Sequence, residues 1–170
     1  SVLTITVNTL PYTAATPTGL ASFCQSTSNT VFTTSGSGNA ISYIWNISPS
    51  GAGSITNNGT SCSIDWNNSY SGSVDISVYG INGCGNGAAS TPLNITINPL
   101  PSQPTINANG NLLASSASSG NQWYHNSSII NGATSQNYTA YNNGSYSVLV
   151  TNSYGCSNIS DPYDYYVYPS

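Results

Sequence analysis

Side chains able to ligate a metal or exchange a proton near neutral pH are few in this 170-residue chain: four Cys, one His and four Asp, with no Glu. Zinc sites use closely spaced Cys and His ligands, but no two cysteines have that spacing and His125 stands alone. Calcium needs several clustered oxygen anions, and only Asp161 and Asp164 are close in sequence. The sequence therefore predicts no metal and no cofactor.

A Ser–His–Asp triad is the catalytic arrangement to weigh against these residues. His125-Asn126 falls in a predicted hairpin turn, and no nucleophile motif surrounds any Ser. We interpret His125 as an exposed turn residue and expect no enzyme. Because Lys and Arg are absent, a P-loop lysine, a Schiff base and an isopeptide crosslink are excluded. Nucleic acids and anionic membranes also lack a cationic partner here.

Aromatic side chains are the remaining candidates for binding. Trp45, Trp66 and Trp123 could form a sugar-stacking platform, as in a carbohydrate-binding module. However, Trp66 alternates in phase with Ile64, and the other two tryptophans occupy equivalent places in two sequence repeats. We therefore expect all three in the core.

The C-terminal tail carries four tyrosines around two aspartates: Tyr163, Tyr165, Tyr166 and Tyr168. A strand cannot bury rings on both faces unless each face is covered. We expect part of this patch to contact a partner.

The elements that must position these residues are strands. Apolar and polar residues alternate with a period of two, as in Ile41–Trp45, Ser63–Trp66, Val74–Val78 and Tyr146–Val150, and Gly/Asn/Ser clusters separate them. Ser, Thr and Asn make up 72 of 170 residues, a low-charge surface that suits an exported or assembled protein. No apolar run approaches the roughly 20 residues of a membrane helix. The sequence predicts an all-β fold of sandwiches and no membrane insertion.

Two repeated units are visible. Gly72–Val78 followed by Gly83-Cys84 is matched 72 residues later by Gly144–Val150 followed by Gly155-Cys156. Three prolines between positions 99 and 104 indicate a stiff linker. We therefore expect two tandem domains, at residues 12–100 and 101–170.

Residues 1–11 repeat the last strand and linker of the first unit: Leu3–Pro11 matches Leu93–Pro101 at an offset of 90. Three interpretations stay open. The segment is the last strand of a preceding repeat, a strand donated to a neighbouring subunit, or the first strand of its own unit.

The first unit contains Tyr43-x-Trp45, Pro49-x-Gly51-x-Gly53-x-Ile55, Gly59-Thr60, Ile64-x-Trp66, Gly72, Ile76-x-Val78 and Cys84-Gly85. This pattern resembles the PKD-like repeats of large secreted and surface proteins of Bacteroidota. The second unit contains Asn121–Tyr124, Ile130-x-Gly-Ala-Thr134, Tyr138, Asn143–Tyr146 and Asn152–Ser157, and is similar to the Ig-like repeat that often follows them. The resemblance implies two β-sandwiches, type IX export, an extracellular or cell-surface location and no catalysis.

Four cysteines in such a chain indicate an oxidising compartment. Related repeats favour a bridge between Cys24 and Cys84, with both at one end of the first sandwich. Cys62 and Cys156 are then left over, either as two idle thiols or as a bridge between units or chains.

Eight N-x-Ser/Thr sequons are weak candidates for glycosylation, because the Asn, Ser and Thr content alone accounts for their number. They lie at Asn46, Asn58, Asn67, Asn94, Asn126, Asn137, Asn143 and Asn158.

The sequence thus predicts a non-enzymatic structural or adhesive segment of an extracellular bacterial surface protein. Its expected partners are neighbouring copies or repeats, with surface glycans as a further option. A self-assembling filament subunit that uses the N-terminal strand is the alternative within structural roles, and a carbohydrate-binding module is the alternative from another class.

Overall fold

The computed structural model describes residues 8–167, and the chain divides into two compact units, Ser1–Pro99 and Leu100–Ser170. Within residues 8–167, all regular elements are strands except one 3-10 turn, η1 (Ser50–Ala52). The predicted all-β class is therefore confirmed. The predicted leading strand of residues 1–11 falls largely outside the described residues, and its described part, from Asn8 onward, is not a strand.

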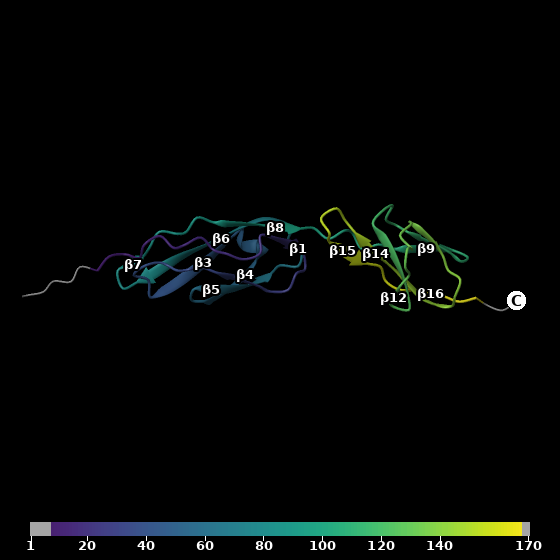
Figure 1. Cartoon of the computed structure of the whole chain (residues 1–170), viewed down its shortest axis with the longest axis horizontal. Coiled ribbons are helices and arrows are strands. Elements are labelled where there is room, and N and C mark those ends of the chain that lie inside the picture. Colours follow the sequence, from purple (N-terminus) through teal and green to yellow (C-terminus); the bar gives the residue numbers. More distant parts are fainter. Residues whose placement is uncertain (1–7, 168–170) are drawn as a thin grey trace, which may run out of the picture. The chain divides into compact units, whose positions relative to one another are not determined.

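Unit 1 is a sandwich of two sheets, with β4 and β5 in one layer and β6 and β8 in the other (Figure 1). One sheet has the order β1-β8-β6-β3, with the short β7 also paired to β6, and the other has the order β2-β5-β4. The strands are β1 (Ser22–Cys24), β2 (Thr30–Thr33), β3 (Ser42–Ser48), β4 (Gly53–Asn58), β5 (Ser61–Trp66), β6 (Gly72–Asn82), β7 (Gly85–Asn86) and β8 (Leu93–Asn98).

Unit 2 is also built from a three-stranded and a five-stranded sheet, and its central strand β14 is shorter than β6. Its sheets have the orders β13-β10-β9 and β12-β11-β14-β15, with β16 also paired to β14. The strands are β9 (Ile106–Asn109), β10 (Leu112–Ser115), β11 (Asn121–His125), β12 (Ser128–Ile129), β13 (Asn137–Thr139), β14 (Gly144–Thr151), β15 (Ser157–Ile159) and β16 (Tyr163–Tyr165).

Period-two alternation explains which side chains are buried, because successive residues of a strand face opposite sides of a sheet. In β6, Val74, Ile76 and Val78 are buried while Asp75 is exposed. Each unit has its own apolar core from such inward positions, and the cores contain Phe32, Ile64, Ile76 and Ile95 in unit 1 and Leu113, Tyr146 and Val148 in unit 2.

A tryptophan on the strand beside the central strand faces a valine in both units. Trp45 of β3 lies opposite Val78 of β6, and Trp123 of β11 lies opposite Val148 of β14. The two valines are 70 positions apart, whereas the glycines that begin these strands are 72 apart. The strands are therefore shifted by two residues relative to the sequence repeat. A shift of two keeps every side chain on its original face, and a shift of one would have reversed it.

A buried serine side chain forms a hydrogen bond with the backbone of the central strand in both units. Ser90 Oγ accepts a hydrogen bond from the Val78 N–H (3.1 Å), and Ser160 Oγ accepts one from the Val148 N–H (3.0 Å). Each serine also donates its own N–H to the carbonyl of the same valine. Sequence reasoning missed this device, although Ser-x-Pro occurs at both places, at 90–92 and 160–162.

Replacing Ser160 by Ala should destabilise unit 2, because the buried Val148 N–H loses its acceptor. An unsatisfied buried donor costs about 1–3 kcal/mol, so the free energy of unfolding measured in urea should decrease by that amount. Ser118→Ala, in an exposed loop, is the matched control and should change little. Equal stability of the two variants would contradict the role of Ser160.

Candidate functional site

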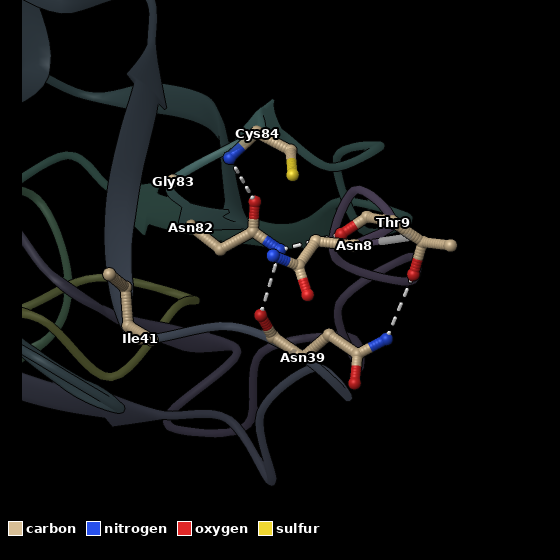
Figure 2. A pocket seen from close by; sticks show the side chains of 7 residues that line it. All are labelled: Asn8, Thr9, Asn39, Ile41, Asn82, Gly83 and Cys84. Atoms are coloured by element: carbon tan, nitrogen blue, oxygen red, sulfur yellow. Dashed lines mark hydrogen bonds between the residues drawn. The ribbon is translucent and has the colours of Figure 1, made fainter. Parts of the chain in front are cut away.

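The end of unit 1 at which the described chain begins contains a hollow of about 490 Å³ (Figure 2). Neutral polar groups, one apolar side chain and one thiol line it: Asn8, Thr9, Asn39, Ile41, Asn82, Gly83 and Cys84. The residues come from the first described segment, the approach to β3 and the β6–β7 hairpin.

Asn82, the last residue of β6, holds this end together (Figure 2). Its Nδ2 donates to the carbonyl oxygens of Thr9 (2.8 Å) and Asn39 (3.0 Å), and its Oδ1 accepts from the Cys84 N–H (2.9 Å). Asn39 Nδ2 adds a hydrogen bond to Thr9 Oγ1 (3.1 Å). One amide therefore fixes three separate parts of the chain without any charge.

The segment that follows Thr9 is bound along its own unit. Tyr12 and Ala15 donate their N–H groups to the carbonyls of Gly38 and Gly36, both at 3.0 Å, and Thr18 donates to Thr33 at 2.8 Å. The path of the chain away from the hollow is thus set by backbone hydrogen bonds.

Cys84 carries a free, exposed thiol in the hairpin turn between β6 and β7. The predicted Cys24–Cys84 bridge is therefore wrong, and the strand register gives the reason. Cys24 pairs with Asn98 at the end of β8, beside the start of β6, while Cys84 lies beyond the other end of β6. Eleven residues of strand at about 3.3 Å each separate them by roughly 36 Å, and a disulfide needs Cα atoms about 4–7 Å apart.

Cys24 and Cys156 are each disulfide-bonded. Cys62 is a free thiol with no exposed surface, in β5 opposite Phe32. A bridge from Cys62 to Cys156 is therefore also wrong, because the core of unit 1 encloses Cys62. The alternative prediction, that both are unpaired thiols, is confirmed for Cys62 and wrong for Cys156.

The sequence repeat equated Cys84 with Cys156, and the hairpins show why these cysteines differ. Asn82 Oδ1 accepts from Cys84 N–H, and Asn152 Oδ1 accepts from Tyr154 N–H (3.0 Å). Cys84 thus corresponds to Tyr154, while Cys156 lies two residues further along and is buried. The shared Asn-x-x-Gly pattern at 82–85 and 152–155 was the available signal for Asn82.

Burial raises the pKa of the Cys62 thiol to about 11, although a backbone hydrogen bond from Phe32 acts in the opposite direction. The protonated thiol is a small apolar group that suits its place in the core. Cys62 is therefore neither a nucleophile nor a metal ligand in the folded chain.

His125 is the last residue of β11, and the hairpin turn itself is Asn126-Ser127, with φ of 47° and 62°. The predicted hairpin is confirmed, but His125 is half-buried instead of exposed in the turn. Its ring stacks on Tyr146 with centroids 4.6 Å apart. A side chain at Gly144 would place Cβ 2.5 Å from His125 Nε2, so glycine is needed to admit this ring.

All three tryptophans are buried, with at most 5% of their surface exposed. Their indole N–H groups donate to the Gly59 carbonyl from Trp45, to Thr30 Oγ1 from Trp66 and to the Ser135 carbonyl from Trp123. The prediction that they belong to the core is confirmed, and they cannot form a sugar-stacking platform.

The tyrosine-rich tail lies partly on its own core. Tyr163 and Tyr165 of β16 are half-buried and pack against the core of unit 2. Tyr166 is 57% exposed, and Tyr168 lies outside the described residues. A contact surface at Tyr166 stays a prediction.

Seven of the eight sequon asparagines are exposed, and Asn158 is half-buried and donates to the Pro101 carbonyl (3.2 Å). Glycosylation stays a prediction. Among residues 8–167, no group of three or more His, Cys or Asp side chains could hold a metal ion. No helix in that range is long and apolar enough to cross a membrane.

Two packed sheets in each unit, with an apolar core that contains buried tryptophans, define an Ig-type β-sandwich protein. The chain belongs to the PKD-like domain family, whose model matches residues 10–95. No curated protein matches the chain.

The solved structures that are similar to the chain include the following three. The FN1–FN3 domains of chicken CNTN1 share 13% identity over 90% of this chain (TM-score 0.36), and the ICAM-5 D1–D4 ectodomain fragment shares 13% over 94% (TM-score 0.44). The BSP domain of a biofilm-associated protein shares 14% over 89% (TM-score 0.37). The matches span 63%, 47% and 29% of those chains, respectively.

The two free thiols should differ sharply in reactivity. At about pH 8, where thiolate formation limits alkylation, iodoacetamide should modify Cys84 rapidly in the folded protein. It should modify Cys62 only as fast as unit 1 unfolds. Peptide mass mapping of the time course measures both rates, and modification of Cys62 at the rate of Cys84 would show that its burial is wrong.

The raised pKa of Cys62 makes stability depend on pH. The thiol is protonated in both states below its ordinary pKa of 9.0, so it contributes no pH dependence there. Between that value and about 11 the unfolded chain loses the proton first, so the free energy of unfolding should decrease as pH rises. In urea titrations, Cys62→Ala should flatten this slope relative to the wild type. Cys84→Ser should keep the wild-type slope, and parallel curves for all three proteins would contradict the assignment.

Proposed function

We propose that the chain is a force-resisting, non-enzymatic segment of an extracellular bacterial surface protein, composed of consecutive sandwiches joined by a Pro-rich linker. Membership of the PKD-like family, an Ig-type fold and disulfide-bonded cysteines support an extracellular role. Export by the type IX route of Bacteroidota, implied by the sequence resemblance, belongs to the same proposal.

The observation that carries the proposal is the parallel pairing of the first and last strands of unit 1. Ser22 to Cys24 of β1 run beside Thr96 to Asn98 of β8 in the same direction. Hydrogen bonds extend past the strand ends, from Thr96 N–H to the Ala21 carbonyl (2.9 Å) and from Gln25 N–H to the Asn98 carbonyl (2.8 Å).

This geometry resists tension because of its direction. A pull on the chain before β1 and after β8 draws the two parallel strands past each other. All hydrogen bonds between them are then loaded at once. In an antiparallel hairpin pulled from its open end, the bonds break one after another. In the described part of unit 2 every strand pair is antiparallel, and the first and last strands lie in different sheets.

Surface chemistry fits a structural role as well. Without Lys or Arg, the chain has no cleavage site for trypsin-like proteases. The burial of all three tryptophans removes the main support for a carbohydrate-binding module. The alternative of a filament subunit with a donated strand depends on residues 1–8, of which only Asn8 lies within the described range.

Single-molecule stretching through the two termini tests the proposal. A reducing agent is included so that no disulfide carries the load. Two unfolding events are expected, and the stronger should release unit 1. At about 3.6 Å per residue, unfolding of the 99 residues of unit 1 should lengthen the chain by roughly 350 Å, and unfolding of the 71 residues of unit 2 by roughly 250 Å. The increase in length therefore shows which unit has unfolded in each event. Unfolding of unit 1 at a force equal to or below that of unit 2 would overturn the proposal.

A further inference from the structure

We propose that the hollow end of unit 1 is a docking surface for another sandwich of the same plan, placed before it in the polypeptide, and that Cys84 forms a disulfide with that unit. The proposal rests on the proposed function as a segment of consecutive sandwiches.

Two exposed apolar side chains lie at this end, and one of them, Ile41, has the highest exposed fraction among the exposed large hydrophobic residues of the described chain. Ile41 is 81% exposed and lines the hollow beside Cys84. Leu10 is 49% exposed and lies against the β6–β7 hairpin, where a Cβ at Gly85 would be 3.3 Å from its Cδ2. We call Leu10, Ile41 and Cys84 the upstream patch. Exposed apolar groups around a hollow are a feature of protein interfaces.

The occupant follows from the sequence and the direction of the chain. Residues 93–98 form β8, the last strand of unit 1, and residues 3–8 repeat them at an offset of 90. By this repeat Asn8 corresponds to Asn98, the last residue of β8, so a preceding sandwich of the same plan would end at Asn8. Only three residues, from Thr9 to Pro11, would then separate the two units, a span of at most about 11 Å. Because Asn82 binds Thr9, a sandwich attached by so short a segment must lie against this end.

The register of unit 1 indicates which residue of the preceding unit meets Cys84. In unit 1, Cys24 is the register partner of Asn98, and the residue that repeats Asn98 is Asn8. A preceding unit of the same plan would therefore hold its own equivalent of Cys24 beside Asn8. Paired strands lie about 4.8 Å apart, and Asn8 lines the same hollow as Cys84. The two cysteines would come within the reach of a disulfide.

The bonding of the other cysteines supports disulfides at these two places, the position of Cys24 and the hairpin after the central strand. Cys24 is disulfide-bonded in this chain, and so is Cys156, which lies in the hairpin of unit 2 that corresponds to β6–β7. Cys84 is the exposed thiol of the corresponding hairpin of unit 1. By strand register Cys84 lies two residues before the equivalent of Cys156, so the two cysteines belong to corresponding hairpin turns.

The chemistry is thiol–disulfide exchange. The Cys84 thiolate attacks a small-molecule disulfide of the oxidising compartment, forms a mixed disulfide and releases one small thiolate. The thiolate of the preceding unit's cysteine then attacks the Cys84 sulfur and releases the second. The two protein thiols lose two protons and two electrons, and the small disulfide is reduced to two thiols.

Peptide mapping of the native protein, isolated from its source with free thiols blocked, tests the proposal. Cys84 is expected in a disulfide with a cysteine from a sandwich upstream of residue 1. Recovery of Cys84 with the blocking reagent attached, in a protein that has such a sandwich, would overturn this inference and leave the proposed function standing. Absence of any upstream sandwich would also overturn this inference, whereas the proposed function is decided by the unfolding forces of units 1 and 2.

An extended chain gives an independent test. Residues 8–92 are placed directly before residues 3–170, so that residues 3–8 complete the added unit. The second of the two Cys84 residues, the one in residues 3–170, should then be alkylated at least about ten-fold more slowly than in the 170-residue chain. Formation of the disulfide should also lower the mass of the protein by two hydrogen atoms. Cys24→Ser in the added copy alone is the matched control and should restore alkylation. Rapid alkylation of this Cys84 in an extended chain whose added unit unfolds cooperatively would contradict the proposal.

Discussion

Every polar contact in this protein must be made without a Lys or Arg side chain, because the sequence contains neither. Hydrogen bonds from amides, hydroxyls and indoles take the place of ion pairs. Asn82 uses both donors and its acceptor to join three parts of unit 1, and Ser90 and Ser160 satisfy the central strand of each unit. Such neutral bonds depend on short distances and fixed directions. Strand pairing and neutral hydrogen bonds, instead of ion pairs with Lys or Arg, therefore fix the positions of the strands.

Register also explains how two units with different sequences share the arrangement around their central strands. The tryptophan, valine and serine of the central strands keep the same relation in both units, although the strands are shifted by two residues against the sequence repeat. Two residues are one full period of a strand, so the core side of each sheet is preserved. The shift instead changes the hairpin at the strand end, where Cys84 is exposed and Cys156 is buried. The two-residue shift therefore appears at the end of the central strand, in the hairpin that follows it.

The parallel pair β1–β8 and the hollow beside Thr9 lie at opposite ends of the same sheet. The first supports resistance to a pull along the chain, and the second supports attachment to a further unit. The chain enters unit 1 at the hollow and leaves it after β8. The same sheet can therefore resist a pull at one end and carry a preceding unit at the other. An exposed thiol at one end and a bonded Cys24 at the other fit a module with two different ends.

The sequence by itself determined the all-β class, the inward strand positions and the burial of Trp45, Trp66 and Trp123, because a period of two fixes the face of each side chain. It did not determine the cysteine pairing. Cys24 and Cys84 are near the ends of strands in the sequence, but only the pairing of β8 with β6 shows that these ends are opposite. The Asn82 network was not determined either, since it joins residues up to 73 positions apart. The roles of Ser90 and Ser160 also required the fold, because the Ser-x-Pro pattern does not say which backbone N–H the serine accepts from. Alternation is a local property of a strand, whereas register and contact across a sheet are decided only when the strands pair in the folded structure.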